Sequence, residues 1–392
     1  MSALSTGFGP IGYMGTLINM RILLSSVPQH GHLLPLLPLA RAFRDRGHDV
    51  AVLTAAGMAP VLARQGLDLL AAGPLPDVLF AEVARRIGAD PATNPTPDSV
   101  AEFFAGTRVD LTADEALAVT AEFRPDLVVA ELCDYVGPLV AASTDTPVAT
   151  LAFGPPLPPP FTDAMDAMAR TRHEARGLQW RPSRWLLDTW PASMRAEEWR
   201  QPEGWLPLRP EAFREPGTES VKAAPSSRPR VLVTFGTFFS QPAQLSPLLR
   251  ALSELDVEIV VTLGLAAQPE EFDVDRSRIT FVGFTPMDDL LDGADVVVTH
   301  GGAGTTSAAL SKGVPLVVLP QGADQFFQAE RVAAAGAGIA LLPPSQTPEA
   351  TVAAVRTVLE DVSVRDSVGM IAKEIAAMPA ASEVAETLEA RP

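Results

Sequence analysis

Two series of short apolar, β-branched segments, each alternating with helix-like segments, constrain the fold of this chain more than any other feature. The first series starts at Met20 with RILLSSV, DVAVLT and DLVVAE, and the second follows residue 229 with RVLVTFGT, DVVVTH and PLVVLP. This alternation is typical of βα units, whose parallel sheet is covered by helices on both faces. The chain has 392 residues, more than one hydrophobic core usually supports. The sequence therefore predicts an α/β protein of two Rossmann-like domains facing each other across a cleft.

The segments outside these series set the predicted domain limits. Residues 1–19 lack the basic start of a secretory signal, so we expect a disordered leader. Segment 215–229 is polar and contains proline, glycine and serine, which is typical of an exposed linker. We expect a first domain over 20–214, a second over 230–375, and a C-terminal tail over 376–392.

Composition excludes several classes of partner. The 47 acidic side chains outnumber the 30 basic ones, and the net charge of −17 would repel a nucleic-acid backbone. No apolar run approaches the roughly 20 residues that cross a bilayer, so no membrane insertion is expected. The single cysteine, Cys133, excludes an internal disulfide framework and fits a reducing cytoplasm. We expect a cytoplasmic protein, and the sequence leaves homodimerisation open.

The strongest local motif is DVVVTHGGAGTTSAAL, which starts at residue 295 and is typical of a strand, a glycine-rich turn and a helix. Gly301, Gly302 and Gly304 would let the backbone approach a ligand closely. Thr305 and Thr306 would open a helix whose free amides and dipole suit a phosphate. The motif therefore predicts an anion site.

Two other phosphate motifs fit this turn less well. In a dinucleotide fingerprint the third small position would fall on Ser307, and that fingerprint usually opens a domain, whereas this turn follows the fourth strand of the second series. The spacing to Lys312 and Gly313 does not match the phosphate loop of nucleoside triphosphatases.

The motif and its neighbours resemble a known family, the inverting, metal-independent glycosyltransferases with the GT-B fold, and most of all the actinobacterial enzymes that decorate antibiotics. The resemblance runs from Met20 to about residue 380. Its matching segments, in chain order, are Gly31-His32-x-x-Pro35, TFGT at 234–237, His300-Gly-Gly-x-Gly-Thr-Thr, Gly313-Val-Pro, Pro320 and Asp324-Gln325.

The resemblance implies that the first domain binds the acceptor and the second binds a nucleotide sugar. It implies roles for eight donor-binding residues: Thr237, His300, Gly302, Gly304 and Thr305 at the diphosphate, Phe284 at the nucleobase, and Asp324 and Gln325 at the sugar hydroxyls. Plant members have tryptophan where this chain has Phe284 and glutamate where it has Ala308. Both departures favour a thymidine diphosphate (TDP) sugar over a UDP-sugar.

The resemblance also implies a general base, His32, three residues before Pro35. An imidazole titrating near neutrality can take the proton of an acceptor hydroxyl. A carboxylate would orient this base and stabilise its charged form. The expected partner is Glu131, at the end of the strand in PDLVVAELCDYVG, with Asp134 as the alternative and no partner as the third possibility. For His30 a structural role is favoured over a place in the site.

No metal or cofactor is expected beyond the nucleotide-sugar co-substrate. Asp273 and Asp275 have the spacing of a metal-binding pair in another glycosyltransferase class, but they lie in a charged connector that we interpret as a solvated loop. Cys133 is expected to pack rather than to act as a nucleophile, because single-displacement transfer has no covalent intermediate.

The predicted function is transfer of a sugar or deoxysugar from a TDP-sugar to a hydroxyl of a hydrophobic natural-product aglycone, with inversion. The five tryptophans, all in the irregular segment 154–215, either line the aglycone pocket or attach this segment to the first domain, and we favour attachment. Two alternatives are a non-catalytic helper of a partner glycosyltransferase and a nucleotide-sugar epimerase of related fold. The intact base and donor motifs favour the transferase.

Overall fold

A computed structural model describes residues 19–214, 217, 226–236, 240–264, 267–283 and 285–390. Thr237 and Phe284, the leader up to residue 18 and most of the predicted linker lie outside these residues, so the predictions on them are not tested by the structure.

The first domain is built on a fully parallel sheet, because its strands carry continuous apolar runs that are buried on both faces. Its described strands, in spatial order, are β3 (Asp68–Ala71), β2 (Asp49–Thr54), β1 (Arg21–Ser25), β4 (Leu127–Glu131), β5 (Val148–Ala152), β6 (Trp185–Asp188) and β7 (Trp205–Pro207). The order reverses between β1 and β4, where Ser25 lies opposite Ala130.

The second domain repeats this plan on another parallel sheet. Its described strands, in spatial order, are β10 (Ile279–Val282), β9 (Glu258–Thr262), β8 (Arg230–Thr234), β11 (Val296–Thr299), β12 (Leu316–Val318) and β13 (Gly338–Ala340). Here the order reverses between β8 and β11, where Thr234 lies opposite Thr299. In open α/β sheets, ligands bind at the carboxyl ends of the strands beside such a reversal.

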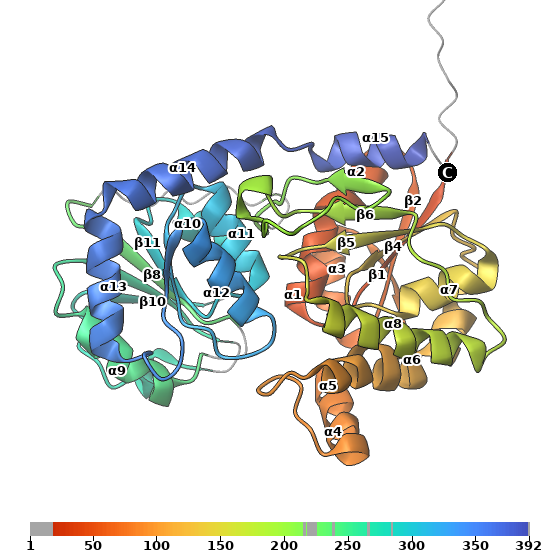
Figure 1. Ribbon diagram of the computed structural model, residues 1–392, viewed down its shortest axis with the longest axis horizontal. Helices are drawn as coiled ribbons and strands as arrows, with labels where there is room; N and C mark the ends of the chain where they lie inside the picture. Colours follow the sequence, from red (N-terminus) through yellow and green to blue (C-terminus); the bar gives the residue numbers. More distant parts are fainter. Residues whose placement is uncertain are drawn as a thin grey trace, which may run out of the picture.

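Helices cover both sheets (Figure 1). Those of the first domain are α1 (His30–Leu33), α2 (Leu37–Asp45), α3 (Ala59–Gln65), α4 (Pro76–Ile87), α5 (Pro97–Ala101), α6 (Arg108–Thr120), α7 (Val136–Thr144) and α8 (Pro159–Glu174). Those of the second domain are α9 (Pro242–Leu252), α10 (Met287–Leu291), α11 (Ala303–Ser311), α12 (Gln325–Ala334) and α13 (Pro348–Glu360). The predicted two-domain α/β architecture is confirmed.

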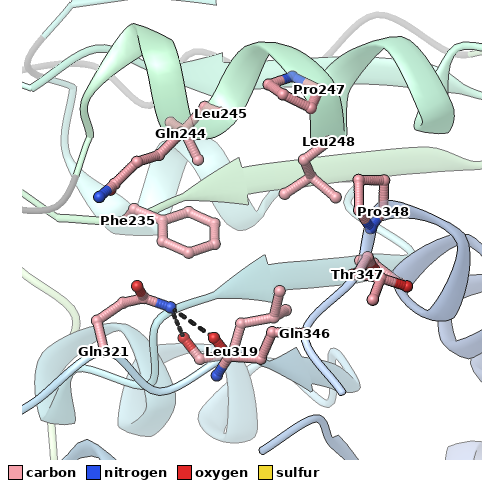
Figure 2. A pocket seen from close by; sticks show the side chains of 11 residues that line it. Phe235, Gln244, Leu245, Pro247, Leu248, Leu319, Gln321, Gln346, Thr347 and Pro348 are labelled. Carbon is pink, nitrogen blue, oxygen red and sulfur yellow. Dashed lines mark hydrogen bonds between the residues drawn. The ribbon is translucent and has the colours of Figure 1, made fainter. Parts of the chain in front are cut away.

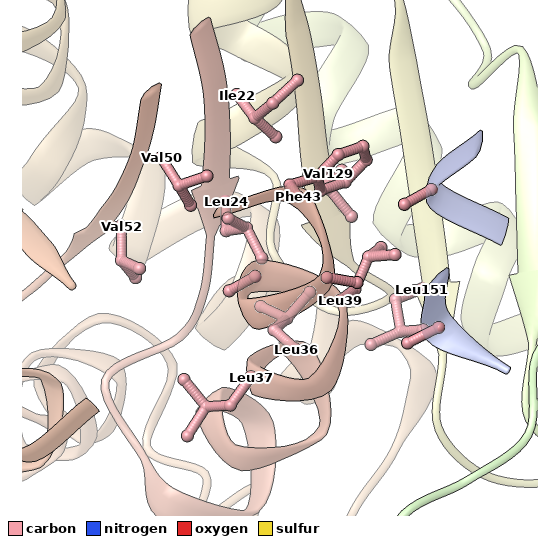
Figure 3. Close-up of a cluster of buried hydrophobic side chains, with 14 of the residues drawn as sticks. Ile22, Leu24, Leu36, Leu37, Leu39, Phe43, Val50, Val52, Val129 and Leu151 are labelled. Carbon is pink, nitrogen blue, oxygen red and sulfur yellow. The ribbon is translucent and has the colours of Figure 1, made fainter. Parts of the chain in front are cut away.

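The C-terminal segment links the two domains. Helix α14 (Val362–Ala377) packs on the second domain through Val368 and Ile371, whereas α15 (Ala381–Glu389) reaches back to the first domain and lies beside α2 (Figure 1). Figure 3 shows the core that α15 joins, in which Leu24 of β1 and Phe43 of α2 are fully buried. The segment predicted as a tail is therefore in part a core element of the first domain.

The tryptophans of segment 154–215 serve packing, as favoured from the sequence. Trp185 is buried in the core of the first domain, and Trp199 and Trp205 flank the guanidinium of Arg195. The prediction that the tryptophans attach this segment to the first domain was wrong for Trp190, which packs with Leu290 and other residues of the second domain. The segment after β6 therefore binds both domains.

The two domains touch along a seam, which we define by two contacts. The backbone N–H of Ala323 donates to the carbonyl of Ala92 across 3.1 Å, and the rings of Phe161 and Phe327 lie 6.0 Å apart, edge to face. Each contact joins a first-domain residue to the loop before α12 or to α12 itself. The segment before α5 and the start of α8 are therefore in contact with the start of α12.

Candidate active site

His32 and Glu131 meet at the strand reversal of the first sheet. His32 lies on α1, which directly follows β1, and Glu131 is the last residue of the neighbouring β4. His32 Nδ1 lies 3.1 Å from Glu131 Oε1, and the two side chains are 15% and 0% exposed. The ring N–H is not aligned for a hydrogen bond with this oxygen, so the contact is mainly electrostatic. Such loose contacts are common in unliganded catalytic sites.

Backbone amides hold the Glu131 carboxylate in place. Its Oε1 accepts from Val27 N at 3.2 Å, and its Oε2 accepts from Cys133 N at 2.8 Å. These two bonds fix the position of the buried carboxylate. Burial lowers the pKa of His32, but the negative charges of Glu131 and Asp324 outweigh it, so the pKa lies above the ordinary value of 6.5.

Asp134, the alternative partner, is occupied elsewhere. Its Oδ1 accepts from Arg108 Nε at 3.1 Å, and its Oδ2 accepts from Gly137 N at 3.0 Å. Arg108 is fully buried and also donates to the carbonyl of Ser26. The structure thus places Glu131, not Asp134, beside His32. His30 starts α1, and burial together with the charge of Arg64 lowers its pKa.

Two phenylalanines enclose the His32 ring. The ring of Phe153, which follows β5, lies 5.3 Å away edge to face, and that of Phe104 lies 5.7 Å away. Phe104 is placed there by a π-helical turn, Glu102–Thr107, between α5 and α6. Sequence reasoning missed both rings and Arg108. An apolar side chain carries no local signal of a site, and neither does a single arginine at the start of a helix.

His300 lies at the corresponding reversal of the second sheet, directly after β11. Gly236 and Gly302 face its ring: a Cβ on Gly302 would lie 2.7 Å from His300 Nε2, and one on Gly236 would lie 3.0 Å from Cε1. Glycine is therefore required at both positions by the close approach of this imidazole. Burial lowers the pKa of His300 to about 4, so the ring is neutral near pH 7.

The N-terminus of α11 follows His300 and fits the predicted anion site. Its N-cap, Gly302, provides no side-chain cap, so no N-cap side chain competes with a ligand for the first amides of the helix. A Cβ on Gly304 would meet no atom within 4 Å, which leaves space above the first turn. Thr305 is buried, and the buried hydroxyl of Thr306 has no partner among the described residues.

Asp324 and Gln325 lie where α12 begins. Burial raises the pKa of Asp324, while a hydrogen bond from Gln328 and the charge of His32 act against this rise. Gln325 Oε1 accepts from Gln321 N at 2.7 Å and from Gly322 N at 3.1 Å, so this oxygen is used within the loop. Asp324 is close enough to His32 for their charges to interact across the seam.

A cavity of about 310 Å³ lies in the second domain beside this loop (Figure 2). Phe235, directly after β8, and Leu319, directly after β12, line it. Gln321 Nε2 donates to Leu319 O at 2.9 Å and to Gln346 Oε1 at 3.1 Å. The described lining has no titratable side chain, so this cavity suits an uncharged group and offers no acid or base.

Three side chains among the described residues could together hold a metal ion: His32, Glu131 and Cys133. Their ligand atoms all lie within 4.8 Å of one another. Burial and the nearby carboxylates raise the pKa of Cys133 well above its usual value, so its thiol is protonated and is a poor ligand in that form. Asp273 forms an ion pair with Arg250, and the carboxylate of Asp275 accepts a hydrogen bond from the backbone N–H of Ser277. Both aspartates belong to an exposed connector, as predicted.

No helix in the described ranges is both long and apolar enough to cross a membrane.

Comparisons with known proteins agree with this architecture. The model of the erythromycin biosynthesis protein CIII-like N-terminal domain matches residues 41–236, and that of its C-terminal domain matches residues 246–391. The L-demethylnoviosyl transferase of Streptomyces niveus is 32% identical over 388 residues, with 95% of this chain and 98% of that protein covered.

Solved glycosyltransferases share the fold over nearly the whole chain. SsfS6 of Streptomyces sp. SF2575, solved with thymidine diphosphate, is 28% identical with a TM-score of 0.80, and the match covers 95% of this chain and all (100%) of that one. The spinosyn rhamnosyltransferase SpnG, solved with spinosyn aglycone, is 27% identical with a TM-score of 0.79, covering 94% and 100%. The chain therefore belongs to the erythromycin biosynthesis protein CIII-like family of GT-B-fold glycosyltransferases.

Proposed function

We propose that this protein transfers a sugar or deoxysugar from a TDP-sugar to a hydroxyl of a hydrophobic natural-product aglycone. The observation that carries the proposal is the position of His32, paired with Glu131 on one side and near Asp324 of the other domain. A base and a sugar-recognising carboxylate on opposite sides of the seam are what transfer between two bound substrates needs. Relatives solved with TDP and with an aglycone support this choice of substrates.

In the proposed reaction His32 removes the proton of the acceptor hydroxyl as the oxygen attacks the anomeric carbon. Glu131 stabilises the imidazolium that forms and fixes the ring, which is the role of the carboxylate in histidine-based triads. The acceptor oxygen displaces TDP in one step, so the anomeric configuration inverts. The phenylalanines around His32 give the acceptor an apolar surface close to the base.

The second domain stabilises the leaving diphosphate in this proposal. The first amides of α11 provide preorganised donors where negative charge develops. His300 is neutral and would act as a hydrogen-bond donor rather than as a cation. These groups supply the electrostatic assistance without a role for a metal ion.

Calorimetric titration of the purified protein with TDP, UDP and NAD tests the donor class without knowledge of the acceptor. The proposal predicts micromolar binding of TDP, weaker binding of UDP and no binding of NAD. NMR of the product anomer with a TDP-sugar and an aglycone panel then tests inversion. Tight binding of NAD, or failure of both diphosphates to bind, would refute the proposed donor.

A further inference from the structure

Gln328, on the first turns of α12, is a fully buried amide next to the seam. Its Nε2 donates to Asp324 Oδ2 at 3.1 Å. Its Oε1 is buried and has no hydrogen-bond partner within the described parts of the chain. The bond to Asp324 is therefore the polar contact that this side chain makes.

Burial of a half-satisfied amide is costly, because an unpaired buried acceptor loses its hydration without compensation. An apolar side chain of similar size would fill the same space without this penalty. The amide is thus better explained by what it does for Asp324 than by packing. Burial raises the pKa of Asp324, and the Gln328 bond opposes that rise and so favours the ionised carboxylate.

The first domain covers this pair directly. A Cβ built on Gly154 would lie 2.6 Å from Gln328 Nε2 and 3.7 Å from Asp324 Oδ2, so any larger residue would have to displace the Gln328 amide. The preceding residue, Phe153, has its ring 5.3 Å from that of His32. Two consecutive residues thus contact the base on one side and the amide that holds Asp324 on the other.

We infer that Gln328 is a positioning residue for sugar recognition: it fixes the Asp324 carboxylate toward the donor sugar, with Gly154 providing the close backbone cover from the acceptor domain. This inference rests on the proposed function, since it assumes that Asp324 contacts the sugar. It gives a role to Gln328, which lies outside the Asp324-Gln325 motif. It also gives a role to Gly154, through which the acceptor domain contacts this pair.

Gln328→Met tests the inference, because methionine keeps the size and removes the donor. The probes are TDP, which lacks the sugar, and TDP-glucose, both titrated calorimetrically. We expect TDP affinity within about twofold of the wild type, and affinity for TDP-glucose about tenfold or more weaker, as expected for a lost bond to a charged group. The control is Gln65→Met, at the end of α3, which removes another buried amide whose oxygen accepts from Arg41.

The pH dependence separates positioning from a merely structural role. Without the Gln328 bond the pKa of Asp324 rises, so the carboxylate is protonated at higher pH and the acid-side loss of TDP-glucose affinity moves to higher pH. Equal weakening of TDP and TDP-glucose would indicate a structural role and overturn the inference, as would unchanged affinity for TDP-glucose. Absence of TDP binding by the wild type would instead refute the proposed function itself.

Gly154→Ala provides a second variant that leaves α12 untouched. Each of the three nearest atoms that the added Cβ would meet belongs to the second domain, and the backbone of Gly154 is not in the left-handed region, so the first domain should fold normally. We expect the same selective loss of TDP-glucose affinity. Gly369→Ala, where a Cβ meets nothing within 4 Å, is the control. Full affinity for TDP-glucose in Gly154→Ala would contradict the proposed cover.

Discussion

Glu131 is the residue that most directly sets the protonation of His32. Its carboxylate lies 3.1 Å from the ring and is held by two backbone amides, so it is fixed next to the imidazole. An imidazole with a raised pKa is a stronger proton acceptor, but it is also protonated, and unable to accept a proton, over a wider acid range. Removal of the Glu131 carboxylate should therefore change both the strength of His32 as a proton acceptor and the pH range over which it is protonated.

Glu131→Gln is predicted to lower kcat by about 10² to 10⁴, because the neutral amide cannot stabilise the imidazolium. The pKa of His32 should fall at the same time, so the acid limb of the kcat/KM profile should move to lower pH. The exposed Glu122→Gln is the control. An unchanged acid limb would mean that the observed ionisation does not belong to His32.

His300 is predicted to be neutral throughout the physiological range. Because burial lowers its pKa to about 4, its charge should not change between pH 6 and 8. The ratio of TDP affinities of wild type and His300→Asn should then be constant over this range, which calorimetry at several pH values can measure. A ratio that grows as the pH falls from 8 to 6 would show that a charged imidazole binds the diphosphate.

At the residue scale, the sequence could predict the polar groups at or shortly after strand ends, but not the residues that enclose and position them. The family resemblance named His32, Glu131 and His300. Because each lies at or shortly after the end of a recognisable strand, topology brings all three to the reversals of the two sheets. Gln328 and Phe104 lie in helical segments where local pattern indicates only burial. Their contacts depend on tertiary packing, which local spacing does not encode.

The π-helical turn before α6 is the element with the clearest structural role near the site. It precedes Arg108, whose guanidinium binds Asp134 and the carbonyl of Ser26 in a fully buried position. The loop after β4 and the segment after β1 are thereby tied to the same side chain. Glu131 ends β4 directly before the first of these segments, and His32 lies on α1, which follows the second.

Arg108→Met should destabilise the protein by about 3 to 5 kcal/mol, because it leaves the buried carboxylate of Asp134 without its partner. Urea unfolding can measure this loss. The exposed pair of Arg181 and Asp145 provides the control, since Arg181→Met should cost no more than about 1 kcal/mol. Equal effects of the two substitutions would contradict the structural importance assigned to the buried pair.

At the element scale, hydrophobic periodicity was sufficient for the strands outside segment 154–215 and for most helices. The interpretation of that segment as irregular was wrong for β6 and β7, which extend the first sheet. The apolar runs of β1 and β4 are fully typical of a parallel sheet, and they appear as predicted. The π-helical turn at Glu102–Thr107 could not be predicted, because its insertion of a residue into a helix leaves no distinct pattern in composition.

For the whole molecule, the path of the C-terminal segment joins the two domains. Helix α15 buries Val384 and Leu388 in the core of the first domain, and Glu389 pairs with Arg46 and His48. The last helix of the chain therefore stabilises the first domain. The amphipathic pattern of α15 indicates a buried face but not the domain that buries it, so the sequence could not predict this contact.

Leu388→Ala should therefore destabilise the first domain by about 2 to 5 kcal/mol, the usual cost of a cavity in a core. Thermal unfolding measures the effect, and hydrogen exchange should place it in α2 and β1. Met370→Ala, at an exposed position of α14, is the matched control. A loss of protection confined to the second domain would contradict the packing of α15.

The central claim is that His32 is the base of a sugar transfer whose donor site lies in the other domain. The most direct test compares transfer rates and TDP affinities of the wild type, His32→Ala and His30→Ala. The account predicts that His32→Ala lowers the rate by about 10² to 10⁴ and leaves TDP affinity unchanged, while His30→Ala keeps most of the activity. Near-full transfer by His32→Ala to an alcohol acceptor would contradict it.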